Sequence, residues 1–161
     1  MTPFDAPPQY LMEETVKVTR PRPAGSETSG SPGPQVFTIR LEERAADWLR
    51  PAIDRISNLT ALARSWDSYG APPVEADCAL HAVQFLLSTA YSSVPPPTIV
   101  PLTDGGIQLE WHRGGIDFEI AFSDLEPGVY VADRDAGEEV ELPLREAATE
   151  LARFAARLAA A

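Results

Sequence analysis

An alternating stretch around two adjacent glycines constrains the fold more than any other part of this chain. From Ile107 to Phe122, apolar and polar residues alternate on both sides of Gly114-Gly115. A period of two is typical of strands with one buried face, and a glycine pair between two such runs is typical of a tight hairpin turn. The sequence therefore predicts an antiparallel hairpin with one packed face and one polar face.

A two-residue turn at Gly114-Gly115 would also determine which residues of the two strands face each other. In that register Trp111 lies opposite Phe118, and Leu109 lies opposite Ile120. These aromatic and aliphatic cross-strand pairs are typical of a packed face. We therefore expect this side of the hairpin to be core.

The same register sets two carboxylates, Glu110 and Glu119, directly opposite each other on the polar face, beside His112 and Asp117. Like charges at cross-strand distance are unfavourable, so the pair requires a cation, a shared proton or an arginine from elsewhere. Three acids and one imidazole suit a divalent-metal site or an acid/base pair for hydrolysis. The alternative is a solvated outer face whose acids oppose aggregation.

Turn-forming segments separate further alternating runs before and after the hairpin. Consecutive strands joined by short turns usually pair as neighbours. The sequence predicts an antiparallel meander of four strands, with a fifth at its end, at residues 98–102, 106–112, 116–122, 129–133 and 139–142.

Apolar residues at helical spacing lie on both sides of this meander. Pro51 is favoured in a first turn but disrupts a helix interior, so residues 42–49 and 51–66 are either two helices or one kinked helix. The apolar stripe of the second segment is Ile53, Ile56, Leu59 or Thr60, and Ala63. Pro143 is expected to start a closing helix, whose inner face is Leu144, Ala147, Ala148, Leu151, Ala155 and Leu158.

A helix is also predicted over residues 74–91, between the first helical region and the meander. The helices are the available cover for the apolar side of the sheet. We expect an α+β fold, with a four- to five-stranded antiparallel meander packed against two or three helices and with a C-terminal helix.

The chain of 161 residues suits one domain with a tail. Residues 1–35 are rich in proline, serine, glycine and threonine, which predicts a flexible tail. Within it, residues 14–19 alternate as in a short strand or a transiently extended segment, and 36–41 are a strand or an extended lead-in. Residues 36–161 are predicted to form a single α+β domain.

The net charge of −11 repels phosphate backbones, and no basic patch offsets it. Lys17 is the only lysine, and the arginines are scattered. No secretion signal or run of roughly 20 apolar residues is present. We expect a cytoplasmic protein that binds neither nucleic acid directly nor membranes.

Motifs for cofactors and catalysis are scarce. The single cysteine, Cys78, excludes an intrachain disulfide and a multi-cysteine metal site, and is interpreted as a small apolar residue of a helix. His81 is interpreted as a surface or boundary histidine. The sequence has no phosphate-binding glycine loop, nucleophile elbow, dinucleotide fingerprint or zinc-binding helix motif, so no cofactor and no catalytic residues are expected.

A connector with two aromatic rings, Trp66-Asp67-Ser68-Tyr69-Gly70-Ala71-Pro72-Pro73, follows the first helical region. Trp66, Asp67 and Tyr69 are candidates for the wall of a ligand site at the junction of helices and sheet. Alternatively, the rings close that junction and Asp67 bonds a backbone amide.

This connector and the later segment Asp104-Gly105-Gly106-Ile107-Gln108-Leu109-Glu110-Trp111-His112 together resemble a family of small bacterial proteins that carry both motifs. The resemblance covers roughly residues 59–122. It implies a bacterial, cytoplasmic protein and transfers no mechanism, because no activity is assigned to that family.

The charge and the lack of an assembled catalytic group favour a non-enzymatic module that binds another, basic protein, as an antitoxin, an immunity protein or an adaptor does. One alternative is a metal-binding protein or hydrolase that uses Glu110 and Glu119, assisted by His112 and Asp117. Another is a small-ligand sensor that uses the junction from Trp66 to Tyr69.

Overall fold

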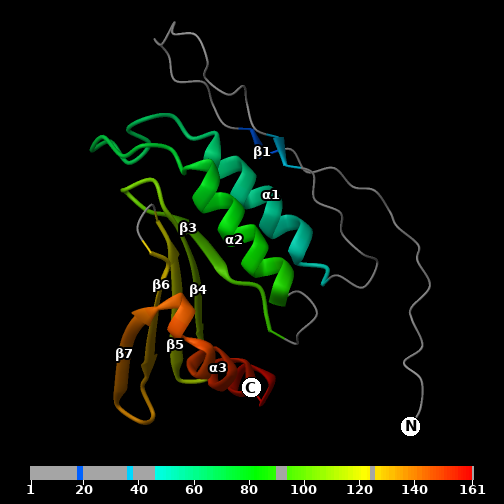
Figure 1. Ribbon diagram of the computed structural model, residues 1–161, viewed down its shortest axis with the longest axis vertical. Coiled ribbons are helices and arrows are strands. Elements are labelled where there is room, and N and C mark those ends of the chain that lie inside the picture. The colour runs from blue at the N-terminus through cyan, green and yellow to red at the C-terminus, as the bar shows by residue number, and fades with distance from the viewer. Residues whose placement is uncertain (1–17, 20–35, 38–45, 90–93, 124–125, 161) are drawn as a thin grey trace, which may run out of the picture.

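The computed structural model of this chain describes residues 18–19, 36–37, 46–89, 94–123 and 126–160. At 18–19, 36–37 and 158–160 it describes the backbone alone. The predicted tail and the segment 42–45 lie mostly outside these ranges. Figure 1 shows a sheet with its helices gathered on one side.

The described strands of the sheet follow one another in sequence order, each antiparallel to the next. The predicted meander is therefore confirmed, including its fifth strand. The strands are β3 (Thr98–Pro101), β4 (Ile107–Arg113), β5 (Ile116–Phe122), β6 (Gly128–Asp133) and β7 (Glu138–Pro143).

The turn between β4 and β5 has the geometry that its glycines predict. Gly114 and Gly115 have φ angles of 63° and 75°, in the left-handed region that favours glycine. A Cβ atom on Gly115 would lie only 2.7 Å from a carboxylate oxygen of Asp135. The register is the predicted one, with Trp111 opposite Phe118.

Three α-helices accompany the sheet: α1 (Leu49–Thr60), α2 (Ala76–Thr89) and α3 (Ala148–Ala160). The helices α1 and α2 pack side by side, α1 against β3 and α2 against β4 and β5. The helix α3 covers the other end of the same face (Figure 1). Its Phe154 contacts Trp111 and Phe118 there.

The first helix ends earlier than its periodicity predicts. It stops at Thr60, not near Trp66, and the next residues form turns in which Ser65 has a φ of 64°. Ile53, Ile56 and Leu59 are buried as expected, whereas Ala63 is exposed outside the helix. Pro51 lies within the first turn, where its missing N–H has no helical partner to lose.

The closing helix also begins later than predicted. Pro143 ends β7 instead of starting a helix, and a single 3-10 turn, η1 (Leu144–Glu146), precedes α3. Proline is acceptable at the end of an edge strand, because that position needs no ladder donor. Ala148, which was expected to face inward, is exposed.

Phe154, which the predicted inner face omitted, is the main contact of α3 with the sheet. Its ring stacks on Phe118 with the centroids 4.0 Å apart and the planes 8° from parallel. It also meets Trp111 edge to face at 5.4 Å. Trp111 donates its indole N–H to the carbonyl oxygen of Pro95 at 2.8 Å, so this buried ring has a polar partner.

Cys78 is buried within α2, as expected for a small apolar residue, and His81 is exposed. The two-residue strands β1 (Val18–Thr19) and β2 (Val36–Phe37) pair antiparallel with each other. This pairing supports the strand interpretation for the described ends of 14–19 and 36–41. None of the helices in the described ranges has the length and apolarity needed to cross a membrane.

Phe154→Ala should destabilise the protein by about 3 kcal/mol, because it leaves a cavity above Phe118 and Trp111. Phe154→Leu should cost roughly half as much, since it keeps part of the apolar volume. Urea denaturation measures both. Ala152→Ser, on the exposed side of α3, should change stability by only about 0.5 kcal/mol. Equal stability of Phe154→Ala and the unchanged protein would contradict this role.

Candidate functional site: the open face of the sheet

The face of the sheet opposite the helices carries the predicted polar residues. No described helix packs on it (Figure 1). We name it the open face, and the strand register divides it into three cross-strand rows. They are Thr98, Glu110, Glu119, Tyr130 and Glu141; Val100, Gln108, Ala121, Gly128 and Pro143; and His112, Asp117, Ala132 and Glu139.

The opposed carboxylates Glu110 and Glu119 are joined by a neutral amide. Gln108 donates from Nε2 to Glu110 Oε1 at 3.0 Å and to Glu119 Oε2 at 2.8 Å. A neutral amide, which the sequence interpretation did not foresee, therefore links the two carboxylates. The reason is geometric: Gln108 lies two residues before Glu110 on the same face and diagonal to Glu119, within reach of both.

His112 lies between two carboxylates. Its Nδ1 is 2.9 Å from Asp117 Oδ1, and its Nε2 is 3.4 Å from Glu110 Oε2. The hydrogen bond to Asp117, followed by that to Glu110, raises the pKa of His112 above its ordinary value of 6.5, and burial opposes this only in part. The imidazolium form is therefore favoured at this position.

Arg134, in the turn after β6, completes this group. Its guanidinium donates to both oxygens of Asp117, at 2.7 Å and 2.6 Å from Nη2. The bonds from Arg134 and then from His112 hold the pKa of Asp117 below its ordinary range. Sequence reasoning missed Arg134, because a residue 17 positions away reaches Asp117 only through the β5–β6 pairing.

Tyr130 and Glu139 form a further pair on adjacent strands. The phenol donates to Glu139 Oε1 at 2.6 Å. That bond, with some burial, raises the pKa of Tyr130 to about 12, so the phenol remains a donor. Neither residue was predicted as part of the site, although the alternation of β6 and β7 would have placed both on this face.

A shallow depression of about 320 Å³ lies in the open face. Its floor includes Ala121 and Gly128, which face each other across β5 and β6. The side chains of Glu119, Tyr130 and Glu141 line the depression around these two small residues. The depression thus combines space above the backbone with acidic walls.

The structure brings together four of the predicted residues, Glu110, His112, Asp117 and Glu119, as linked pairs along the strands. Their oxygens and nitrogens are engaged with one another, with Gln108 and with Arg134. In the part of the chain that the structure describes, no three histidine, cysteine or acidic side chains are grouped so as to hold a metal ion.

The connector residues form a separate, internally bonded loop. Trp66 donates its indole N–H to the carbonyl oxygen of Pro72 at 2.8 Å. Asp67 Oδ1 accepts from the backbone N–H of Tyr69 at 2.9 Å and of Ala71 at 3.0 Å, as the structural alternative predicts. The bond from Tyr69 is the main cause that lowers the pKa of Asp67. The Tyr69 side chain is 94% exposed.

This loop contacts the turn between β3 and β4. The N–H of Glu75 donates to the carbonyl oxygen of Gly105 at 2.8 Å. Gly105 has a φ of 94°, and a Cβ atom there would lie 3.3 Å from the ring of Pro72. The two motifs noted in the sequence therefore touch through this glycine. No hydrogen bond or ion pair between described residues joins the loop to the open face.

Comparisons with known proteins add no relative from which a role could be transferred. No protein-family model, curated protein or solved structure matches the chain. The site is therefore interpreted from its own geometry.

Stability should depend on pH through His112. The pKa of His112 is raised in the folded state. Its contribution to the free energy of unfolding is therefore fully present below pH 6.5 and is lost as the pH rises through the raised pKa. Titration of the ring resonances by NMR should give a pKa above 6.5. Asp117→Asn should lower the pKa of His112, because it removes the main hydrogen-bond partner of the ring. Glu139→Gln should leave this pKa unchanged, because Glu139 is bonded to Tyr130 and not to His112. An unchanged value in Asp117→Asn would contradict the assigned cause.

Gln108→Ala should destabilise the fold by about 1 kcal/mol, because two hydrogen bonds are lost and two carboxylates then face each other unbridged. Thermal or urea denaturation measures the effect. Gln84→Ala, at an exposed position of α2, is the matched control. Equal stability losses in the two variants would argue against the bridge.

Proposed function

We propose that this protein is a non-enzymatic protein-interaction module that binds a basic partner protein through the open face of its sheet. One observation carries the proposal: a sheet face that no described helix covers bears a concentration of acid. Five carboxylates belong to it, against the two basic side chains His112 and Arg134. They are Glu110, Asp117, Glu119, Glu139 and Glu141.

The sign of the charge selects the class of partner. A chain with a net charge of −11 repels phosphate backbones and attracts basic protein surfaces. Electrostatic attraction of this kind speeds association and favours partners of opposite charge. The partner is therefore a protein with a basic surface, and nucleic acid is not bound directly.

The acidic groups are also held in place before a partner arrives. Gln108 bridges Glu110 and Glu119, Tyr130 bonds Glu139, and Arg134 bonds Asp117. Side chains that are already ordered lose less conformational entropy on binding. This arrangement supports binding without requiring a reaction.

The depression above Ala121 and Gly128 suits one basic side chain of the partner. The apolar floor matches the aliphatic part of a lysine or arginine, and the carboxylates of Glu119 and Glu141 match its charged end. A Cβ atom built on Gly128 meets no atom within 4 Å, so a larger side chain there would enter the depression.

A cytoplasmic antitoxin, immunity protein or adaptor would use such a surface, and we propose that role from the size and charge of the chain. The metal-binding or hydrolytic alternative gains no support from the described residues, because Gln108 occupies the space between Glu110 and Glu119. The sensor alternative gains none either, since the bonds of Trp66 and Asp67 are made within their own loop.

Copurification from the native host at low salt tests the proposal. A stoichiometric basic protein should be recovered, and its affinity should fall about tenfold for Glu119→Gln with Glu141→Gln, since each lost charge pair costs up to roughly 1 kcal/mol. Gly128→Leu should weaken binding without any change in charge.

The matched control is Asp47→Asn with Asp77→Asn, which removes two exposed charges near α1 and on α2. It should retain the partner, and isothermal titration calorimetry with the purified partner quantifies all variants. Recovery of no basic partner, or equal affinity for the open-face and control variants, would show that the open face is not the binding surface.

A further inference from the structure

The strand β7 presents a free backbone edge. It is the last strand of the sheet, and no described strand pairs with its outer side. It spans six residues, whereas β3 at the opposite edge spans four; each of the two strands ends in a proline, Pro143 and Pro101. A long unpaired edge offers a row of backbone donors and acceptors to another strand.

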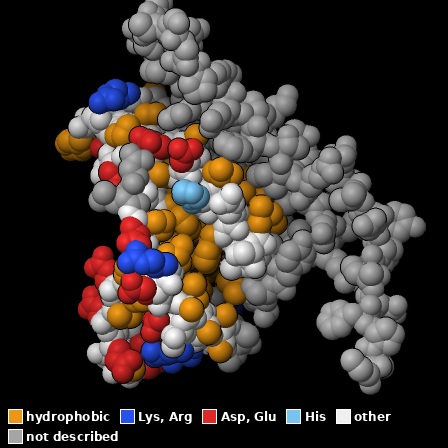
Figure 2. Space-filling model, in the orientation of Figure 1, with side chains coloured by type: hydrophobic (Ala, Val, Ile, Leu, Met, Phe, Trp, Pro, Cys, Tyr) orange, Lys and Arg blue, Asp and Glu red, His pale blue; other side chains and the backbone are white. Residues whose placement is uncertain are grey.

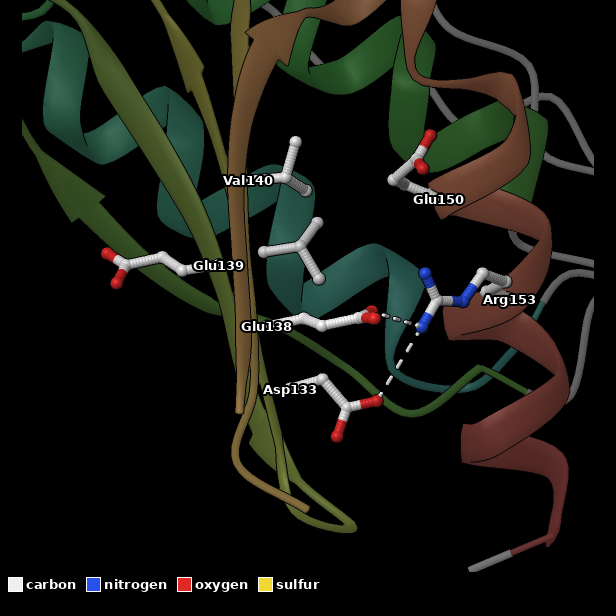
Figure 3. A pocket seen from close by; sticks show the side chains of 7 residues that line it. Asp133, Glu138, Glu139, Val140, Glu150 and Arg153 are labelled. Carbon is white, nitrogen blue, oxygen red and sulfur yellow. Dashed lines mark ion pairs between the residues drawn. The ribbon is translucent and has the colours of Figure 1, made fainter. Parts of the chain in front are cut away.

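A groove of about 320 Å³ runs between β7 and α3 (Figure 3). Val131 and Val140 are register partners on β6 and β7 and form its apolar part. They continue the cross-strand row of Trp111 and Phe118 on the helix-covered side of the sheet. The Phe154 ring covers that row at its other end, and Val140 remains 39% exposed.

The rim of the groove is acidic. Figure 3 shows Glu138 and Arg153 meeting across it, with Glu150 beside them on α3. Arg153 lies 3.5 Å from Glu138 and 3.7 Å from Asp133, which are long and partly exposed ion pairs. The carboxylate of Glu150 makes no hydrogen bond or ion pair within the described part of the chain.

From this geometry we infer that β7 and the groove beside it bind an extended segment of a partner protein as a sixth strand. Its groove-facing residues, every second one along the strand, are basic, apolar and basic in turn. Main-chain hydrogen bonds to β7 supply the attachment. An apolar side chain packs on Val140, and basic side chains pair with Glu138 and Glu150. The inference shares with the proposed function only the basic character of the partner, because it uses a different surface.

Charge decides between this occupant and a second copy of the chain. Pairing of β7 with itself about a two-fold axis would bring together Glu138, Glu139 and Glu141 of both copies. Like charges in opposed strands are destabilising, and inward or edge charges are a known protection against such pairing. Figure 2 shows acidic side chains gathered at this side of the molecule, which a basic strand complements.

The probe is the capped peptide Thr-Lys-Thr-Val-Thr-Lys-Thr, whose lysines and valine share one face of a strand, added to the full-length protein. Two isomers carry three backbone N-methyl groups each, one on the two lysines and the valine and one on the last three threonines. Alternate residues of a strand direct their N–H groups to opposite edges. If the peptide binds as an added strand, one isomer should keep an affinity within about twofold of the parent peptide, and the other should bind at least roughly tenfold more weakly. If the peptide binds by charge alone, both isomers should have the same affinity.

Amide chemical shifts locate the bound peptide, and calorimetry gives its affinity. Shifts should concentrate on β7 and on the side of α3 that carries Glu150. Glu150→Gln should weaken binding about threefold, as loss of one partly exposed charge pair does. Asp77→Asn is the matched control, because it removes one exposed charge from α2, which does not line the groove, and it should leave the affinity unchanged.

Three results would overturn the inference: no binding at about 1 mM peptide, equal affinity for the two N-methylated isomers, or shifts centred on Glu119 and Tyr130. The third result would place the peptide on the open face and so leave the proposed function standing. Conversely, whether Glu119→Gln with Glu141→Gln weakens binding of the native partner tests the open face only and does not test the groove. The proposed function and this inference can therefore be disproved independently.

Discussion

The turn at Gly114-Gly115 is the constraint on which the rest of this structure depends. It fixes the register of β4 and β5, and in a sheet with one buried face a shift of one residue would exchange every inward and outward side chain. Trp111 and Phe118 would then face water, and Glu110 and Glu119 would face the helices. The strong penalty for burying unpaired charge makes that shifted register unfavourable for this sequence.

From that register follows the division of the molecule into a helix-covered side and an acidic side. Two consecutive residues at the end of β6 illustrate it. Asp133 is 5% exposed and faces the helices, where Arg157 of α3 approaches it at 3.3 Å. Arg134 points the other way and holds Asp117 on the open face. The end of β6 therefore ties α3 to the sheet and also arranges the surface that we propose for partner binding.

The two proposed surfaces arise from the limits of the helical cover. Helices α1, α2 and α3 lie on one side only, which leaves the open face to solvent. On the covered side, the contact of Phe154 with Phe118 leaves Val140 at the edge of the sheet partly exposed. Both surfaces are acidic because the alternation of β7 places Glu138 on one side and Glu139 and Glu141 on the other. A basic partner is thus favoured at either place.

Much of this organisation follows from local pattern. The alternation of residues 107–122 sufficed to predict the hairpin, its register and the opposition of Glu110 and Glu119, because strand pairing across a tight turn depends on sequence separation alone. The meander followed from turn residues between short alternating runs. Helix limits were less well predicted: α1 stops at Thr60, and Pro143 belongs to β7, where contacts outside the local window decide.

What the sequence by itself determined was therefore the sheet, its two faces and the acidic character of one of them. Only the tertiary structure decided that Phe154 anchors α3, that Gln108 bridges two carboxylates, and that Arg134 and Asp117 meet. These contacts join residues on different elements or diagonal positions, and their partners depend on how strands twist and helices dock. Such distances are set by the packing of the whole domain, which no local period in the sequence encodes.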